Sequence, residues 1–378
     1  MPNTTADYTK LEDEDDDELR QELIPKKNED TPVVFSQTKS IIFAILTGLF
    51  FAFHNFTLGS LAKLGYLARC DSGVGLGLGS VLYYIYQYIK YKNKNEDYFD
   101  WRKSVFRNQN PDVPEQDRYK FECWILIGII IRAAIAVGTG VMVIISFGLA
   151  LEGGMNQGII TAIFGMSPFI ISIMFYMKFR ETLKKSQLIG MVFMIVCIIM
   201  IGFLRAPSEE AIAQVDYNPS GVPIALILSI ICPFFFALDG LVVRILCTDY
   251  KTDANEMTQA AYLFQGVLCL FASILIYAFS QDPLHEFIWM NTLQMVLAGL
   301  ILNVGGVFAA IAVSIGSAGV AYSLFNTQVI MFILLAALLL GQIPTTIEIV
   351  AVIFGIMGSC IMSLGPEIYD KLTRRLRN

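Results

Sequence analysis

Two charged side chains lie deep within long apolar stretches of the sequence. Arg132 lies 12 residues past Lys120, roughly 18 Å along a helix, and Asp239 lies 10 residues before Asp249, roughly 15 Å. A charge at the centre of a membrane span costs at least roughly 2.5–3.5 kcal/mol, so it requires a partner or water. The similar depths predict that Arg132 and Asp239 meet, either in a substrate-binding cavity or as an ion pair that locks two helices. The cavity is favoured, because intramembrane charge generally marks a functional site.

Uncharged polar side chains complete the candidate site. His54 can take up a proton near neutral pH and couple it to movement of a solute, or it is simply hydrogen-bonded between helices. Tyr322 can present its ring and hydroxyl to the same cavity, or it packs without a further role. Amides in a membrane must find partners, and they either bind a polar ligand or join helices. The amides in question are Asn156, Gln157, Gln265, Asn303, Asn326 and Gln328.

Ser167 and Pro168 lie in the middle of another apolar stretch. Proline removes one backbone hydrogen bond and kinks a helix. A bend used for gating and a static kink are equally compatible with this pattern, so the pair is a candidate gating element.

The composition argues against an enzyme and against a metal or cofactor site. Hydrophobic residues make up 55% of the 378 residues, and residues 287–347 contain no charge at all. The seven cysteines are scattered without a CxxC pair, and there are only two histidines. No phosphate-binding loop, HExxH motif or nucleophile elbow is present. We therefore expect no catalytic residue, no bound metal, no cofactor and no nucleic-acid partner.

The apolar pattern predicts an all-α polytopic membrane protein, because only helices or closed barrels satisfy the backbone in lipid. Ten spans are expected near 40–62, 72–89, 121–150, 155–177, 187–204, 222–246, 257–280, 288–314, 317–340 and 346–364. The domains are an acidic disordered tail (1–38), a first five-helix repeat with a loop at 90–120 (39–204), a linker (205–221), a second repeat (222–364) and a basic tail (365–378). In the second span, Gly75 and Gly79 are expected to admit a neighbouring helix closely.

The basic residues set the predicted orientation. With a cytosolic N-terminus, 23 of the 27 lysines and arginines fall on the cytosolic side, and both termini are cytosolic. Lys63, Arg69 and Arg205 then lie in outer loops, and Arg244 is expected to snorkel to the cytosolic interface.

An internal repeat relates the two halves. FFAFHN (50–55) resembles FFALDG (235–240), and Gly158, Ala162 and Phe179 match Gly319, Ser323 and Leu340 at an offset of 161. Because each half has an odd number of spans, the second copy enters the membrane upside down. Inverted repeats in transporters place the site near the midplane, between the halves.

The first half also carries a recognisable pattern. Ser167-Pro168 in mid-span, Glu181 at the span end and then Gln187-x-x-Gly190 resemble the EamA-type half of the drug/metabolite transporter superfamily. The likeness extends over about residues 40–364 and is nearest to the eukaryotic branch that includes nucleotide-sugar transporters. It implies a cavity lined by spans 1–4 and 6–9, with spans 5 and 10 peripheral and able to pair two copies. In the second half Gln328-Val329 replaces Ser-Pro, and Gln342 stands where Glu181 stands.

These observations predict a solute carrier, a secondary transporter of a small polar metabolite that works by alternating access without ATP hydrolysis. A transport-inactive scaffold or regulatory protein with the same fold is the alternative, and a channel is a third possibility. One cation and one anion suit an amino acid, a nucleotide-linked sugar or a base about equally. The membrane is expected to be an endomembrane or the plasma membrane.

Overall fold

The computed structural model describes residues 37–61, 64–93, 104–110, 113–114, 120–153, 160, 163–164, 167–180, 185–203, 220–280, 288–316, 318–340, 346–347, 349–358 and 360–361. The expected tail 365–378, most of 1–38 and 205–221, and the amides Asn156 and Gln157 lie outside the described residues.

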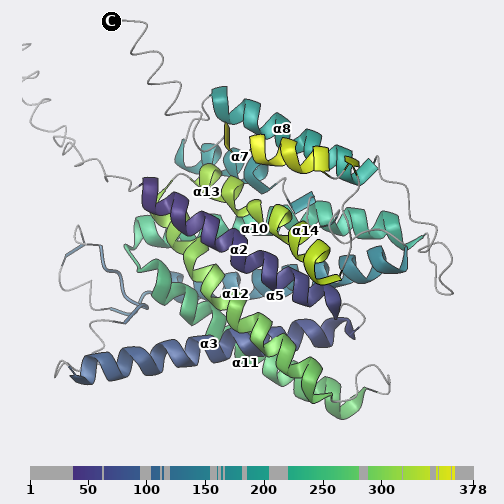
Figure 1. Cartoon of the computed structure of the whole chain (residues 1–378). Coiled ribbons are helices and arrows are strands. Elements are labelled where there is room, and N and C mark those ends of the chain that lie inside the picture. Colours follow the sequence, from purple (N-terminus) through teal and green to yellow (C-terminus); the bar gives the residue numbers. More distant parts are fainter. Residues whose placement is uncertain are drawn as a thin grey trace, which may run out of the picture. The chain divides into compact units, whose positions relative to one another are not determined.

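The described residues are helical almost throughout (Figure 1). The helices are α2 (Gln37–Ser60), α3 (Tyr66–Asn93), α5 (Cys123–Glu152), α7 (Ser167–Phe179), α8 (Lys185–Phe203), α10 (Gly221–Asp249), α11 (Ala254–Phe279), α12 (Trp289–Ile315), α13 (Ala318–Phe325) and α14 (Thr327–Leu340). A short apolar helix, Ile349–Gly358, follows. Within these ranges the only β pairing is an isolated bridge between Arg107 and Phe121.

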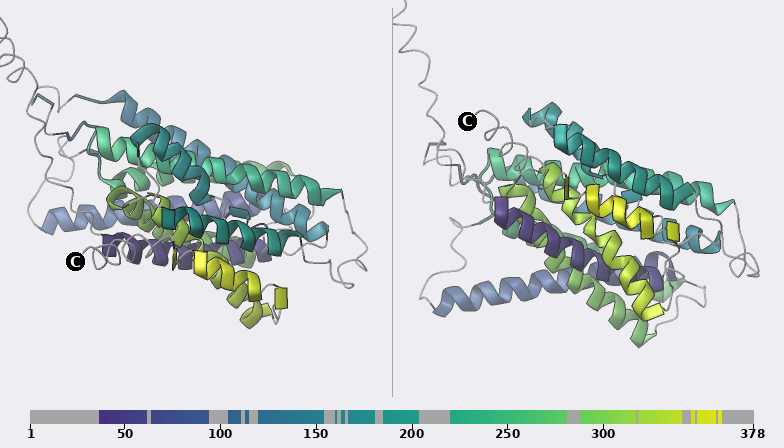
Figure 2. Two further views of the ribbon diagram at one scale, coloured as in Figure 1. Left: turned by 90° about the horizontal axis from the view of Figure 1, so that it is seen from above. Right: turned by 45° about the horizontal axis from the view of Figure 1, so that its top comes forward.

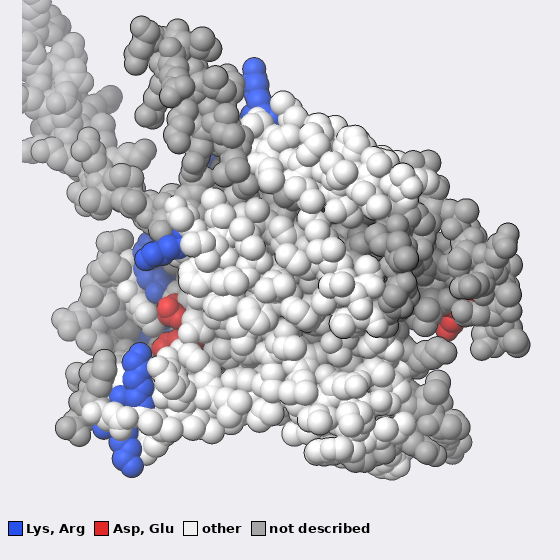
Figure 3. Space-filling view, in the orientation of Figure 1, with Lys and Arg blue, Asp and Glu red and all other residues white. Residues whose placement is uncertain are grey.

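Six helical segments of the described chain are long and apolar enough to cross a membrane: Thr38–Ser60, Cys123–Ala150, Gly221–Asp249, Ala254–Phe279, Trp289–Ile315 and Ala318–Leu339. The shortest has 22 residues, which span roughly 33 Å as a helix. Large apolar side chains such as Phe271 and Leu338 point outward, 64% and 79% exposed. Figure 3 shows most of the described charged side chains along the left edge of the face drawn and an acidic side chain near the right edge. The described surface between these two edges is largely uncharged. An all-helical membrane protein explains this surface, and the ten-span inverted repeat stays a prediction.

Helices of the first predicted half pack mainly against helices of the second. α2 packs against α12, α3 against α11 and α12, and α5 against α10. To one side, α8 lies along Ile349–Gly358, where the rings of Phe193 and Phe354 are 5.6 Å apart (Figures 1 and 2). The interior is thus built from contacts between residues far apart in the sequence.

Glycines bring α3 unusually close to its two partners. A Cβ added at Gly77 would lie 2.7 Å from the Cα of Gly266 in α11, and one at Gly75 would overlap the carbonyl of Val296 in α12. A Cβ at Gly79 would lie 2.8 Å from Cγ of Asn303. The close approach predicted for Gly75 and Gly79 is confirmed.

α3 begins at Tyr66, six residues before the predicted span, so the outer-loop position predicted for Arg69 is wrong. The helix can include Asp71 because its carboxylate is satisfied in the interior. Asp71, 4% exposed, accepts hydrogen bonds from Ser273 Oγ at 2.8 Å and from Tyr277 Oη at 2.7 Å. Burying a carboxylate requires such donors.

The predicted span 317–340 is not one continuous helix, because α13 ends at Phe325 and α14 begins at Thr327. Around Asn326 the backbone bonds tighten to three-residue steps, from its N–H to Ser323 O (3.3 Å) and from Val329 N–H to its carbonyl (3.0 Å). The Thr327 hydroxyl donates to Leu324 O at 2.8 Å. Tightened turns within a helix often mark hinges.

Arg244, which is predicted to snorkel to the cytosolic interface, has direct hydrogen-bond partners at the end of α12. Its Nη1 donates to the carbonyls of Val313, Ser314 and Gly316 at 2.8, 3.0 and 3.3 Å. These carbonyls end α12 and have no partner within the helix. A cation is stabilised there by the helix dipole, so Arg244 caps the C-terminal end of α12.

Candidate functional site

Arg132 and Asp239 form an ion pair between α5 and α10, as their depths predict. Arg132 Nε donates to Asp239 Oδ1 at 2.8 Å and Nη2 to Oδ2 at 3.5 Å. A third donor, Nη1, contacts Thr258 Oγ1 of α11 at 2.7 Å. The side chain of Arg132 is 5% exposed and that of Asp239 is 29% exposed. The arginine is therefore fixed by three helices, whereas the carboxylate keeps an accessible face.

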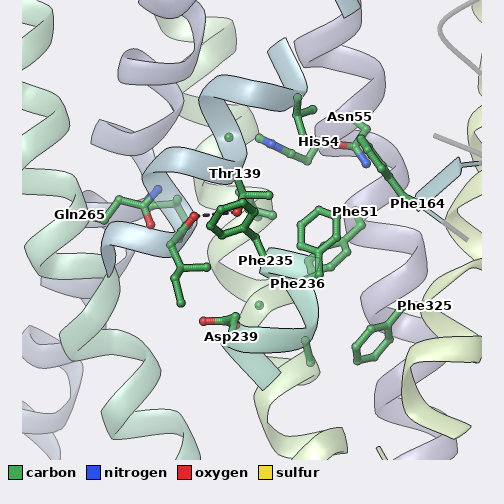
Figure 4. A pocket seen from close by; sticks show the side chains of 18 of the residues that line it. Phe51, His54, Asn55, Thr139, Phe164, Phe235, Phe236, Asp239, Gln265 and Phe325 are labelled. Carbon is green, nitrogen blue, oxygen red and sulfur yellow. Dashed lines mark hydrogen bonds between the residues drawn. The ribbon is translucent and has the colours of Figure 1, made fainter. Parts of the chain in front are cut away.

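The pair borders a cavity of about 170 Å³ between helices of both predicted halves. Most of its wall is apolar and aromatic, with Phe51, Phe164, Phe235, Phe236 and Phe325 around its middle (Figure 4). A small number of polar groups in an aromatic wall is typical of sites for small molecules. Of the predicted site residues, those that line it are Arg132, Asp239, His54, Tyr322, Asn326, Gln328, Gln265 and Ser167.

An apolar layer lies beyond each end of the polar lining. One layer includes Met257, Ile129, which lies one turn before Arg132, and Leu246, which lies two turns beyond Asp239. Val105, from the described part of the 90–120 loop, packs into this layer. The other layer includes Phe147 and Met295. Along α5, Arg132 therefore lies between these two clusters of buried apolar side chains.

His54 lies at the other end of the lining from Asp239 (Figure 4). Its Nδ1 is 3.2 Å from the carbonyl oxygen of Ala298. Because a carbonyl only accepts hydrogen bonds, Nδ1 carries the proton in this contact, and Nε2 of the neutral ring is an acceptor. The arrangement agrees with both interpretations of His54, since the ring is hydrogen-bonded to α12 and also lines the cavity.

Arg69 is a second arginine of the cavity, and the sequence interpretation missed it. It lies in the first turn of α3, is 5% exposed and donates from Nη2 to Ala136 O of α5 at 3.0 Å. Its Nε is buried and has no hydrogen-bond partner. A Cβ at Gly140 would overlap the guanidinium, so this glycine makes the position possible. Arg69 was missed because it precedes the apolar run that begins at residue 72, and a charge just outside such a run is expected in a loop.

The predicted amides differ in what they contact. Gln265 is fully buried, and neither its Nε2 nor its Oε1 has a hydrogen-bond partner. Gln328 accepts a hydrogen bond from Asn55 Nδ2 at 3.1 Å. Asn303 exchanges hydrogen bonds with Gln259 at 3.0 and 3.2 Å and also donates to Leu76 O at 3.0 Å. Asn303 is not among the lining residues, and its contacts join α12 to α3 and α11.

Tyr322 lines the cavity next to Asp239 but its hydroxyl is directed at a helix. It donates to Phe236 O of α10 at 2.9 Å, and a Cβ at Gly240 would lie 2.6 Å from Oη of Tyr322. The tyrosine therefore presents its ring, more than its hydroxyl, to the cavity.

Ser167 and Pro168 are the first two residues of α7 as the structure describes it. Ser167 Oγ donates to Phe164 O at 2.5 Å. Proline is well tolerated in a first helical turn, where its missing N–H has no partner to lose.

Comparison with known proteins gives a family match over the C-terminal part of the chain and a similar fold. The profile of the EamA-like transporter family matches residues 223–364. A solved structure described only as a crystal structure of a protein has a TM-score of 0.58 to this chain, with 15% identity, covering 91% of this chain and 99% of that one. At that identity the likeness shows the fold alone. Among curated proteins, none matches the sequence.

Proposed function

We propose that this chain, of which residues 223–364 match the EamA-like transporter family, belongs to the drug/metabolite transporter superfamily. It is an integral multi-pass membrane protein, and it acts as a secondary transporter of a small polar metabolite. The two halves alternate access to one cavity, without ATP hydrolysis and without catalysis. The eukaryotic branch near the nucleotide-sugar transporters is its expected place in the superfamily.

One observation carries the proposal: the Arg132–Asp239 pair lines a cavity instead of being enclosed between helices. A purely structural ion pair gains most from full burial with every polar atom satisfied. Asp239 keeps 29% of its side chain exposed, at an aromatic-walled cavity. Charge at this depth is costly and generally marks a functional site.

The positions of matched residues support the inverted repeat. His54 and Asp239 occupy the same place in FFAFHN and FFALDG, and they line opposite ends of one cavity. Ser167 and Gln328 correspond at the offset of 161, and they lie at the starts of α7 and α14. Transporters with inverted repeats bind substrate beside such helix interruptions. We infer that the Ser167–Pro168 segment and the break at Asn326 are the two gating elements.

The remaining features follow from this assignment. Both termini face the cytosol, in an endomembrane or the plasma membrane. α8 and the helical stretch near 346–361 lie away from the cavity, and a second copy of the chain pairs through them. An epitope tag at residue 1 or 378 that is accessible only from the outer side would overturn this topology.

The alternative is a scaffold or regulatory protein that keeps the fold and moves nothing. The scaffold requires the deep polar groups to satisfy one another by hydrogen bonds, as Asn303 and Gln259 do. Two buried side chains of the cavity, Arg69 and Gln265, keep polar atoms without partners. A binding cavity explains these unpaired groups, and the scaffold does not.

The test is uptake into proteoliposomes that contain the purified protein and no ATP, screened over a library of labelled metabolites. We expect at least one compound to accumulate above the level of protein-free liposomes and to exchange with unlabelled compound trapped inside. The Asp239→Asn variant is reconstituted in the same way, and we expect it to take up less of the compound than wild type does. Equal uptake by wild type and by protein-free liposomes over the whole library would favour the scaffold.

A further inference from the structure

The charges that line the cavity do not balance. Among its described lining residues, Arg69 and Arg132 are cations and Asp239 is the anion. Asp239 is already held by Arg132 through two hydrogen bonds. With His54 neutral, the cavity carries one excess positive charge, and that charge resides on Arg69.

No nearby carboxylate of the described chain neutralises Arg69. Asp71 is two residues away, but its Oδ1 accepts from Ser273 and its Oδ2 from Tyr277. The described contact of the guanidinium is to the carbonyl of Ala136, and Nε is buried without a partner. A guanidinium has five N–H donors in a fixed fork that matches carboxylate and phosphate groups. Leaving it unpaired in an apolar site is costly, so an incoming anion is strongly favoured.

A second buried side chain supplies the complementary polar contact. Gln265 lines the same cavity, is 0% exposed, and has both amide atoms without a partner. Buried amides in proteins almost always have partners. One donor and one acceptor are therefore available for the uncharged part of a ligand.

The volume of the cavity limits the ligand. A cavity of 150 Å³ in another protein holds benzene, so 170 Å³ accepts a molecule of about six to ten non-hydrogen atoms. This size excludes a nucleotide-linked sugar from the present conformation. It fits a small organic acid, an amino acid, or a small anion that bears a phosphate group.

From these observations we propose that Arg69 is the anion-binding residue of the cavity, and that the substrate is a small carboxylate- or phosphate-bearing anion whose uncharged part hydrogen-bonds to Gln265. This inference names the substrate class of the transporter proposed above and rests on that proposal. Arg132 and Asp239 remain a neutral pair at the other end of the site.

The experiment measures ligand-induced thermal stabilisation of the purified full chain with four probes of similar size. Lactate and inorganic phosphate are the anions, lactamide is the neutral counterpart of lactate, and alanine is the zwitterion. We expect lactate or phosphate to raise the melting temperature and lactamide to have no effect. A stronger response to lactate assigns a carboxylate substrate, and a stronger response to phosphate assigns a phosphate.

Three variants locate the effect. Arg69→Gln should lower the apparent affinity for the better anion about tenfold to a hundredfold, which is the range for losing a charge-assisted hydrogen bond. Arg69→Lys should retain part of the affinity, and Lys90→Gln, which removes an exposed charge from the same helix, should match wild type. If Arg69→Gln is not monodisperse, Gln265→Met replaces it, and we expect several-fold weaker binding.

Uptake of labelled lactate and phosphate into proteoliposomes separates this inference from the proposed function. Arg69-dependent binding without uptake upholds the anion site and overturns transport. Uptake that Arg69→Gln leaves unchanged upholds transport and overturns the anion site. Binding of lactamide as strong as that of lactate, or the absence of stabilisation by either anion, also overturns it.

Discussion

Asn55 of α2 donates from Nδ2 to Oε1 of Gln328 at 3.1 Å, and this hydrogen bond joins the two predicted halves at the start of α14. Both side chains line the cavity, and Gly48, two turns earlier on α2, packs against the break in the same helix. A Cβ at Gly48 would lie 3.2 Å from Phe325 O. α2 therefore holds the interrupted helix both at its break and at its first turn.

The Asn55–Gln328 bond should be measurable by a double-mutant cycle. We expect Asn55→Ala and Gln328→Ala to couple by about 0.5–1.5 kcal/mol, the usual net value of one hydrogen bond. The measurement is thermal unfolding of both single variants and the double variant in detergent. Strict additivity of the two effects would show that the bond contributes nothing in solution.

Asp239→Asn should impair transport more than folding. An amide keeps the shape and one acceptor, but Arg132 loses its counter-charge while it keeps Thr258. Removing one partner of a fully buried pair costs about 3–5 kcal/mol, and the partly exposed carboxylate reduces this figure. Uptake should fall at least tenfold with only a small change in melting temperature. Asp249→Asn, at the exposed end of the same helix, is the control and should transport as wild type does.

Gly77→Ala should be strongly destabilising. The added Cβ would meet the backbone of Gly266 at 2.7 Å, and backbone cannot rotate away as a side chain can. We expect a loss of at least about 2 kcal/mol, in the range of overpacked cores. Gly138→Ala in α5 has no atom within 4 Å of the added carbon and should be neutral or stabilising by up to about 1 kcal/mol. Equal melting temperatures of the two variants would contradict the close packing.

Pro168→Ala should slow exchange while leaving the protein folded. The substitution restores an N–H that can compete with Ser167 Oγ for the carbonyl of Phe164 and extend the helix through the segment. We expect a several-fold lower rate of counterflow and a change in stability below about 1 kcal/mol. Ser167→Ala removes the side-chain bond but keeps the proline, and serves as the comparison. Wild-type rates in the proline variant would reduce Pro168 to a structural role.

The Arg132–Asp239 pair was accessible to sequence reasoning because depth along a helix is counted directly from the sequence. Charges that interrupt long apolar runs are visible, and the requirement for a counter-charge then selects the partner. The same reasoning placed His54 and Gln265 in the candidate site. The structure brings all four to one cavity, and each of them lies well inside an apolar run.

Arg69 and Arg244 show what that reasoning did not predict. Both lie near the ends of apolar runs, where charge has an ordinary explanation in loops or snorkelling. What fixes them is tertiary: the carbonyl of Ala136 and the space over Gly140 for Arg69, and the end of α12 for Arg244. Asn303 is the opposite case: the sequence places it among the cavity candidates, but it does not line the cavity. Its partner Gln259 lies 44 residues away, and no local pattern pairs the two.

The glycine contacts of α3 also decide where the molecule can come apart. At Gly75 and Gly77 the main chain of α3 lies against the main chain of the neighbouring helix, and at Gly79 it lies against the side-chain amide of Asn303. No flexible side chain separates the helices at these positions. Such a joint resists both sliding and separation. We therefore expect α3 to move with α11 and α12, although it lies in the other predicted repeat. The boundary between moving parts is then not the boundary between the two predicted repeats.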